Sequence, residues 1–359
     1  MRPRDTVPFT ACRQAGAAAT SGPDRGPVPP ACPDFLGERF PELAFPPAAG
    51  REQDYRRACE RGYATMARSR VAITGLARNL AAVLPATIRR IERLQSLFAD
   101  SRVVVYENDS TDATKLLLQK WAASDDRVHV TLEDCRDPRN PPKRCAHRAE
   151  RMARYRQRCQ QLVLETCGHF DATIVIDLDV AGGWSEDGVA NSFGHHDWDF
   201  IGSNGLIYRR DGLRINATRQ YDMWALRFDP ELSPIPTSQA GRYLYTRGEP
   251  LVPVTCCFGG LGIYRMDAYR HGRYGTTDTE HAGFHREMIH QGFPRLFLNP
   301  SQILIYGRRH RCGDPFVAAV ARAWAALRGR PATPWIFGPN RRAAAPAQAD
   351  TAAHRRRAV

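Results

Sequence analysis

Residues 172–179 read Ala-Thr-Ile-Val-Ile-Asp-Leu-Asp, an apolar run that ends in two carboxylates one residue apart. The run is typical of a buried β-strand. Its acidic end, Asp177 and Asp179, would then lie near the sheet edge at which open α/β folds bind their ligands. Hard divalent cations prefer oxygen ligands, and such a pair can share a metal with a substrate diphosphate. An isolated pair of carboxylates could also mark a strand end that simply faces water. The neighbouring segments of the chain are needed to choose between these two interpretations.

Two upstream segments predict strands of the same sheet. Residues 102–106 (RVVVY) form an apolar strand that runs into the acidic turn 107–114 (ENDSTDAT), and a helix is predicted over residues 115–123. Residues 71–79 (VAITGLARN) predict an earlier strand with a glycine-containing loop, followed by a helical stretch over residues 80–98. This alternation predicts an α/β fold, with a mostly parallel central sheet and helices on both faces.

These motifs resemble those of a known enzyme family. The acidic turn is similar to the Asp-Asp-Gly-Ser-Thr-Asp turn of GT-A glycosyltransferases, with Glu107 in the first acidic position and Asp109 where the general pattern has glycine. Asp177 and Asp179 resemble their metal-binding Asp-X-Asp. The resemblance covers residues 71–310. It implies a GT-A-like fold with one catalytic domain, a nucleotide-sugar donor and a divalent metal cofactor, Mn²⁺ or Mg²⁺.

A looser resemblance concerns the second half of the chain. Three segments there are similar to the fungal capsule-associated family of mannosyltransferases: residues 198–205 (WDFIGSNG), 221–224 (YDMW) and 258–265 (FGGLGIYR). This resemblance implies hexosyl transfer, with mannose as one candidate sugar.

The metal ligands are expected at the acidic strand end. Asp179 is the better candidate for direct ligation, and Asp177 would reach the metal or the donor ribose. The resemblance implies a third ligand, often a histidine, from later in the chain. We favour His310, because it would close the core of the domain, over the alternatives His281 and His285.

Donor contacts are expected from one acid and several arginines. Glu107 would accept a hydrogen bond from the nucleobase, as the matching acid does in the resembled family. Its alternative role is a carboxylate favoured by the dipole at a helix start. Arg78 in the first loop, and Arg154 or Arg156 on a predicted helix over residues 146–167, are candidates for base or diphosphate contacts, because guanidinium forks suit phosphate oxygens.

The acceptor side is expected in the second half. If the reaction inverts configuration, a base must take the acceptor proton, and Glu280 and Asp278 are the first candidates. Asp222 is a further candidate, and Trp224 could stack on a sugar ring. If the enzyme retains configuration, these acids would position the acceptor instead.

Charge composition favours an anionic partner. Lysine and arginine number 51 against 38 acidic residues, for a net charge of +13. This balance suits nucleotide diphosphates, acidic glycans, anionic lipid surfaces or nucleic acid, and charge alone selects none of them. A specific nucleic-acid partner would require a stacking platform or a recognised helix motif, and neither is evident.

The cysteine spacing and the apolar segments indicate in which cellular compartment the protein is expected. The ten cysteines form no C-x-x-C pair, which argues against a zinc ribbon, and their scatter is unlike a disulfide scaffold. The N-terminus has no apolar signal region, and no run of 18 apolar residues occurs. We therefore expect a cytoplasmic protein, soluble or in peripheral contact with an anionic membrane.

Three parts are expected along the chain. Residues 1–50, rich in Pro, Ala, Gly and Arg, predict a disordered or low-complexity segment. Residues 51–330 would form the catalytic domain, and residues 331–359 a disordered tail rich in Ala and Arg. Between Asp179 and Val254 the chain is expected to be loop-rich, as acceptor regions often are.

Together these features predict a metal-dependent glycosyltransferase. It would move a sugar from a UDP- or GDP-linked donor to a glycan or a lipid-linked saccharide. A nucleotidyltransferase of similar sheet type is the main alternative enzyme, although its expected Gly- and Lys/Arg-rich loop is poorly matched by residues 74–78 (TGLAR). A basic nucleic-acid-binding protein is the alternative from another class.

Overall fold

The computed structural model describes residues 39–141, 145–211, 214–276 and 278–309. The helices are α1 (Glu52–Met66), α2 (Leu84–Gln95), α3 (Thr114–Ser124), α4 (Ala146–Cys167), α5 (Glu186–Phe193), α6 (Met266–His271) and α7 (Glu280–His290), with 3-10 turns η2 (Glu42–Ala44) and η3 (Thr237–Gln239). The strands are β1 (Arg70–Ala77), β2 (Asp100–Asn108), β3 (Val128–Glu133), β4 (Ala172–Ile176), β5 (Gly183–Trp184), β6 (Phe200–Asp211), β7 (Arg214–Gln220), β8 (Val252–Pro253), β9 (Leu261–Arg265) and β10 (Leu296–Arg309).

The strands form one ten-stranded sheet in the order β3-β2-β1-β4-β9-β6-β10-β5, with β7 paired to β6 and β8 to β10. The four strands from β3 to β4 run parallel to one another. β9 is antiparallel to both of its neighbours, and β6 and β10 are again parallel. The main strands therefore share one direction apart from β9, which agrees with the predicted, mostly parallel sheet.

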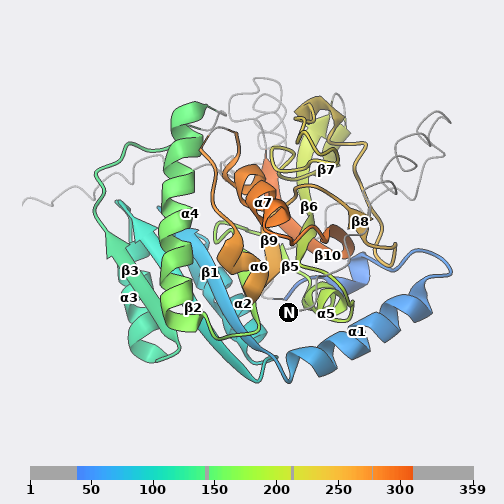
Figure 1. The fold of residues 1–359 in the computed structure, drawn as a ribbon, viewed down its shortest axis with the longest axis horizontal. Coiled ribbons are helices and arrows are strands. Elements are labelled where there is room, and N and C mark those ends of the chain that lie inside the picture. Colours follow the sequence, from blue (N-terminus) through green and yellow to red (C-terminus); the bar gives the residue numbers. More distant parts are fainter. Residues whose placement is uncertain (1–38, 142–144, 212–213, 277, 310–359) are drawn as a thin grey trace, which may run out of the picture.

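Alternate side chains of the strands enter two separate cores. Ile73 of β1 belongs to the cluster that includes Leu94 of α2 and Leu118 of α3. Ala72 belongs to the cluster that includes Val163 of α4 and Phe284 of α7. Figure 1 shows α4, α6 and α7 in front of the sheet, with α2 and α3 behind it. The period of two along a strand thus puts helices on both faces, as predicted.

The region after the Asp-X-Asp is less irregular than expected. It contains the long strand β6 as well as α5 and β7, so the prediction of a loop-rich stretch was wrong for these residues. β6 carries Gly202, Ser203, Asn204 and Gly205, residue types that are rare in strands. They are accommodated because the strand is buried between β9 and β10, where the Ser203 hydroxyl donates to the carbonyl of Leu261 at 2.8 Å.

The described part of the chain includes residues that precede the predicted boundary at residue 51. Phe40 and Phe45 stack on each other and are buried against Leu206 and Ile305, which are paired on the adjacent strands β6 and β10. Residues 1–38 lie outside the described part, as do the predicted tail 331–359 and the preceding residues from 310 onward. Among the helices that the structure describes, none combines the length and the apolar character needed to cross a membrane.

Candidate functional site

A cleft of about 260 Å³ opens at the carboxyl ends of β1 and β4. β2 lies on one side of β1 and β4 on the other, so the strand order reverses here, which is where open α/β sheets bind their ligands. The lining combines the ends of β1 and β2, the turn after β4, α4, the segment after β7 and the start of α7. Its arginine, acidic and histidine side chains are Arg78, Arg148, Arg156, Asp177, Asp179, Asp222, Asp278, Glu280 and His281.

Both carboxylates of the Asp-X-Asp face this cleft and are held by protein donors. Asp177 accepts hydrogen bonds from Arg156 Nη2 at 3.0 Å and from the Tyr221 hydroxyl at 3.1 Å. Asp179 accepts one from the Tyr306 hydroxyl at 2.8 Å. Burial raises the pKa of Asp177 to about 6, an effect that Arg156 opposes. Both carboxylates of the motif are therefore oriented by protein donors.

Arg156 joins the two halves of the chain beneath the cleft. It is 5% exposed and extends from α4. Its Nε donates to Glu280 Oε1 at 3.1 Å while Nη2 reaches Asp177, and its guanidinium lies 5.1 Å from the Phe258 ring centre. Burial alone would lower the pKa of Arg156, but the two carboxylates raise it above the ordinary value. Nε and Nη2 are thus engaged by acids of the protein, and the contact of Arg156 with the donor stays a prediction.

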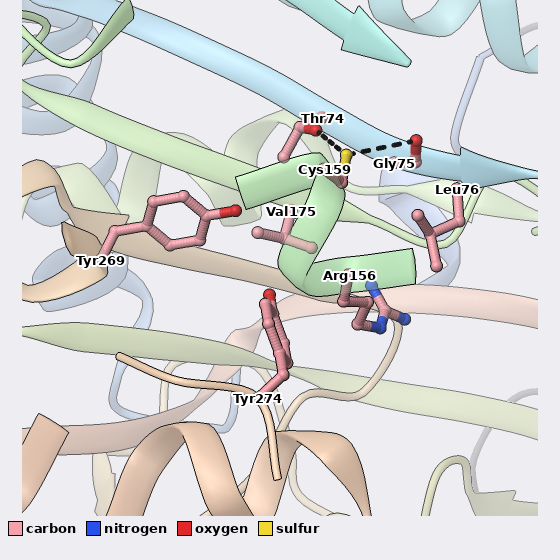
Figure 2. Close-up of a pocket in the computed structure, with 8 residues that line it drawn as sticks. All are labelled: Thr74, Gly75, Leu76, Arg156, Cys159, Val175, Tyr269 and Tyr274. Carbon is pink, nitrogen blue, oxygen red and sulfur yellow. Dashed lines mark hydrogen bonds between the residues drawn. The ribbon is translucent and has the colours of Figure 1, made fainter. Parts of the chain in front are cut away.

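A second cavity lies on the other side of Arg156 and is much smaller. Figure 2 shows Arg156 and Tyr274 at this cavity, with Cys159 of α4 in hydrogen-bonding distance of Thr74. Its volume is about 10 Å³, which corresponds to a single water molecule. It cannot accept a substrate, so the larger cleft is the candidate active site.

The acidic turn after β2 is built around two carboxylates. Glu107 is fully buried, and its Oε1 accepts the backbone N–H of Ser110 at 2.7 Å. The neighbouring Asn108 lines the cleft, whereas Glu107 is outside its lining. Asp109, which replaces the glycine of the resembled pattern, adopts φ +56°, a left-handed conformation that Asp tolerates better than most residues. The turn geometry is therefore retained without glycine.

The same turn is tied to its surroundings by Asp112. Its carboxylate accepts the backbone N–H of Thr114 at 2.9 Å, at the start of α3, and that of Ala81 at 3.1 Å. This is a helix-start role, and it also joins the loop after β1 to the loop after β2.

The two remaining arginine candidates lie in different environments. Arg78 lines the cleft, and its Nη2 donates to the carbonyl of Asp137 at 2.6 Å. Arg154 is exposed on α4 and bonds to the carboxylate of Asp137, so it lies outside the cleft lining. Arg148 lines the cleft instead, with its guanidinium 5.2 Å from the ring centre of Trp224.

The three acids of the second half also line the cleft. Glu280 begins α7 after the cap residue Thr279, and Asp278 accepts a hydrogen bond from Arg227 Nη2 at 3.4 Å. Asp222 adopts φ +57°. Burial, followed by the charges of Asp177 and Glu280, raises the pKa of Asp222 well above its ordinary value. Burial among other acids therefore favours the neutral form of Asp222.

The three candidate histidines have different surroundings. His310 lies outside the described residues. His285 is buried, and its Nε2 is 3.1 Å from the Tyr264 hydroxyl. His281 lines the cleft and stacks on Phe258 at 4.0 Å between ring centres. Within the described part of the chain, neither of its ring nitrogens has a hydrogen-bond partner, and burial keeps its pKa well below the ordinary value. His281 is therefore a neutral, buried ligand candidate.

A separate group of possible metal ligands lies on the opposite side of the acidic turn. One ligand atom each from Asp109, Cys135 and Asp137 lies within 4.8 Å of the others. Protein donors already bond to its carboxylates: the side chains of Arg154 and Tyr155 donate to Asp137, and backbone N–H groups donate to Asp109. These bonds join the acidic turn to the loop after β3.

Sequence reasoning missed several cleft residues: Asn108, Arg148, Tyr221 and Tyr306. Arg148 lies on the predicted arginine-rich helix, and Tyr221 lies in the segment quoted for the looser resemblance. The sequence carried no signal for the two tyrosines. Their role depends on the acids that they contact in the folded structure.

Comparison with known proteins is limited to distant structures. No protein-family model matches the sequence, and no curated protein matches it. The chain is similar to a mannosyltransferase from Pyrobaculum calidifontis in complex with GDP-Man and Mn²⁺, at 16% identity over 79% of this chain and 73% of that chain, with a TM-score of 0.41. It is also similar to GalNAc-T7 with UDP, GalNAc and Mn²⁺, at 14% identity over 68% of this chain, with a TM-score of 0.43. The chain spans 45% of the length of that structure.

A third similar structure is glucosyl-3-phosphoglycerate synthase from Mycobacterium tuberculosis, in complex with Mn²⁺, uridine diphosphate and phosphoglyceric acid. The identity is 14% over 76% of this chain and 83% of that chain, with a TM-score of 0.39. At such distances the function has to be argued from the cleft itself.

Proposed function

We propose that this protein is a metal-dependent glycosyltransferase of GT-A type that uses a nucleotide-sugar donor. One observation carries the proposal. The two carboxylates of the Asp-X-Asp and the acids of the second half line a single cleft at the switch point of the sheet. Donor activation and acceptor binding can therefore occur side by side, as sugar transfer requires.

The donor side suits a hard divalent cation. Asp177 and Asp179 offer oxygen ligands at the cleft wall, each already oriented by a hydroxyl donor, which fits Mn²⁺ or Mg²⁺. A bound cation would neutralise the charge that develops on the leaving diphosphate. Arg78 and Arg148 line the same cleft and are our candidates for contacts with donor oxygens. His281, whose ring nitrogens have no hydrogen-bond partner among the described residues, is a candidate for the third ligand alongside His310.

The acceptor side is assigned to the acids of the second half of the chain. Glu280 is our candidate base if the reaction inverts configuration, and Asp278 is the second. Asp222, whose pKa is raised by burial, would bond to an acceptor oxygen. Trp224 offers a ring face for a sugar beside Arg148. In a retaining reaction the same acids would position the acceptor.

The proposed identity of the donor and of the acceptor rests on the sequence resemblance. UDP- and GDP-linked hexoses are the proposed donors, with GDP-mannose the first to test. A glycan or a lipid-linked saccharide is the proposed acceptor, and peripheral contact with an anionic membrane is a further proposal for the basic chain.

The test is the identity of the leaving group. The protein would be incubated with Mn²⁺ and a panel of UDP- and GDP-sugars, and separately with nucleoside triphosphates and sugar phosphates. Release of a nucleoside diphosphate from one donor, stopped by chelation, is the expected result. Release of pyrophosphate from a triphosphate would show a nucleotidyltransferase instead.

A further inference from the structure

We propose that Tyr221 and Tyr306 form a positioning pair that orients the two carboxylates of the Asp-X-Asp for the metal. This inference rests on the proposed function, since it concerns the same metal site. Neither tyrosine is a metal ligand in this account. Each would act through the aspartate to which it is bonded.

The geometry of the pair is specific. The two rings stack with their centres 4.3 Å apart and their planes at 13°. The Tyr221 hydroxyl donates to Asp177 Oδ2 at 3.1 Å, and the Tyr306 hydroxyl donates to Asp179 Oδ2 at 2.8 Å. One stacked pair therefore bonds to both acids of the motif.

The two rings come from distant parts of the chain. Tyr221 directly follows β7, and its backbone N–H donates to the carbonyl of Gly205 at 2.7 Å. Tyr306 lies in β10, beside β6 in the sheet. Tyr306 lies at the register shift between Ile305 and Gly307, so the turn after β4 is held by one ring from the end of β7 and one from an irregular position in β10. A site supported by strands is positioned more closely than one supported by loops alone.

Hydrogen bonding to one oxygen of a carboxylate leaves room for ligation. Each carboxylate oxygen has two lone pairs, so Asp177 and Asp179 can accept a tyrosine proton and still offer an electron pair to a cation. Donors of this kind fix the orientation of metal-binding carboxylates, and their removal typically lowers metal affinity 10- to 100-fold. Stacking restricts both rings, so each hydroxyl is held at its aspartate before any cation arrives.

Tyrosine-to-phenylalanine variants separate the hydroxyl from the ring. Y221F and Y306F keep the stack and lose one donor each, and the double variant loses both. Y243F is the matched control, because the Tyr243 ring stacks on Phe228 away from the cleft. Folding would be checked by circular dichroism and thermal denaturation.

Mn²⁺ binding, in the presence of UDP or GDP, would be measured by electron paramagnetic resonance. We expect the Kd for Mn²⁺ to rise about 10-fold or more in each single variant and further in the double variant. At limiting Mn²⁺ the turnover of the variants should fall well below that of the wild type, whereas at saturating Mn²⁺ it should stay closer to the wild-type value. A merely structural role of the tyrosines would lower turnover at both Mn²⁺ concentrations. Y243F should bind Mn²⁺ as the wild type does.

The controls separate this inference from the function on which it rests. If the wild type and D179N bind Mn²⁺ equally, both the metal site and the positioning pair are wrong. If D179N loses the metal while folded Y221F and Y306F bind it as tightly as the wild type, the positioning pair alone is wrong. Should Y221F fold poorly, Y306F decides the question by itself.

Discussion

Replacing Arg156 with methionine should cost a large part of the stability of the protein. The variant keeps much of the side-chain volume but leaves Asp177 and Glu280 buried without their shared cation. Breaking a buried ion pair by removing one partner costs roughly 3–5 kcal/mol. The two carboxylate side chains are still 19% and 11% exposed, so water can relieve part of the penalty. We therefore expect a loss at the lower end, about 3 kcal/mol.

The assay is chemical denaturation followed by tryptophan fluorescence, with R154M as the matched control. Arg154 lies on the same helix, and its side chain is 57% exposed in its ion pair with Asp137, so R154M should cost less than about 1 kcal/mol. The loss in R156M should shrink at acidic pH, because the unpaired carboxylates then become neutral. An R156M protein as stable as R154M at pH 7 would refute the reasoning.

Three further predictions concern other parts of the site. Glu107→Ala should weaken binding of UDP or GDP by roughly 1–3 kcal/mol, because the turn held through Ser110 loses its acceptor; unchanged calorimetric affinity would reduce Glu107 to a local structural role. Glu280→Gln should lower transfer to the acceptor by about 100-fold or more while donor binding is kept, and normal transfer rates would remove Glu280 from the mechanism. His285 has a pKa lowered to about 3 by burial. In the unfolded chain this histidine is protonated below about pH 6.5, so acidification below that value lowers the free energy of unfolding. Between pH 7 and pH 5 the wild type should therefore lose roughly 2 kcal/mol more of this free energy than His285→Gln, as measured by denaturation.

The apolar elements of the first half could be predicted closely from the sequence. The expected strand over residues 172–176 is β4, and the expected helix over residues 146–167 is α4, with the same bounds. Both have a strong hydrophobic pattern that local sequence reveals. β6 was missed because its glycines and polar residues gain their strand conformation only from the neighbours on either side.

Contacts within the site were harder to predict than its location. The order of the motifs placed Asp177 and Asp179 at a strand end, and the structure puts that end in the cleft. Arg156 was predicted as a donor contact, but its bonds to Asp177 and Glu280, one acid from each half of the chain, could not be predicted from the sequence. The hydrogen-bond and stacking partners of Tyr306 depend on the pairing of strands that are distant in the sequence, and no local sequence pattern predicts that pairing.

The most direct test of the account compares the wild type with Asp179→Asn for Mn²⁺-dependent release of nucleoside diphosphate from a UDP- or GDP-sugar. We expect the variant to fold normally and to lose this activity, because a carboxylate ligand is replaced by a weaker, neutral one. The wild type should lose the same activity on chelation and regain it on addition of Mn²⁺. A folded Asp179→Asn protein that releases the diphosphate at the wild-type rate would contradict the central claim.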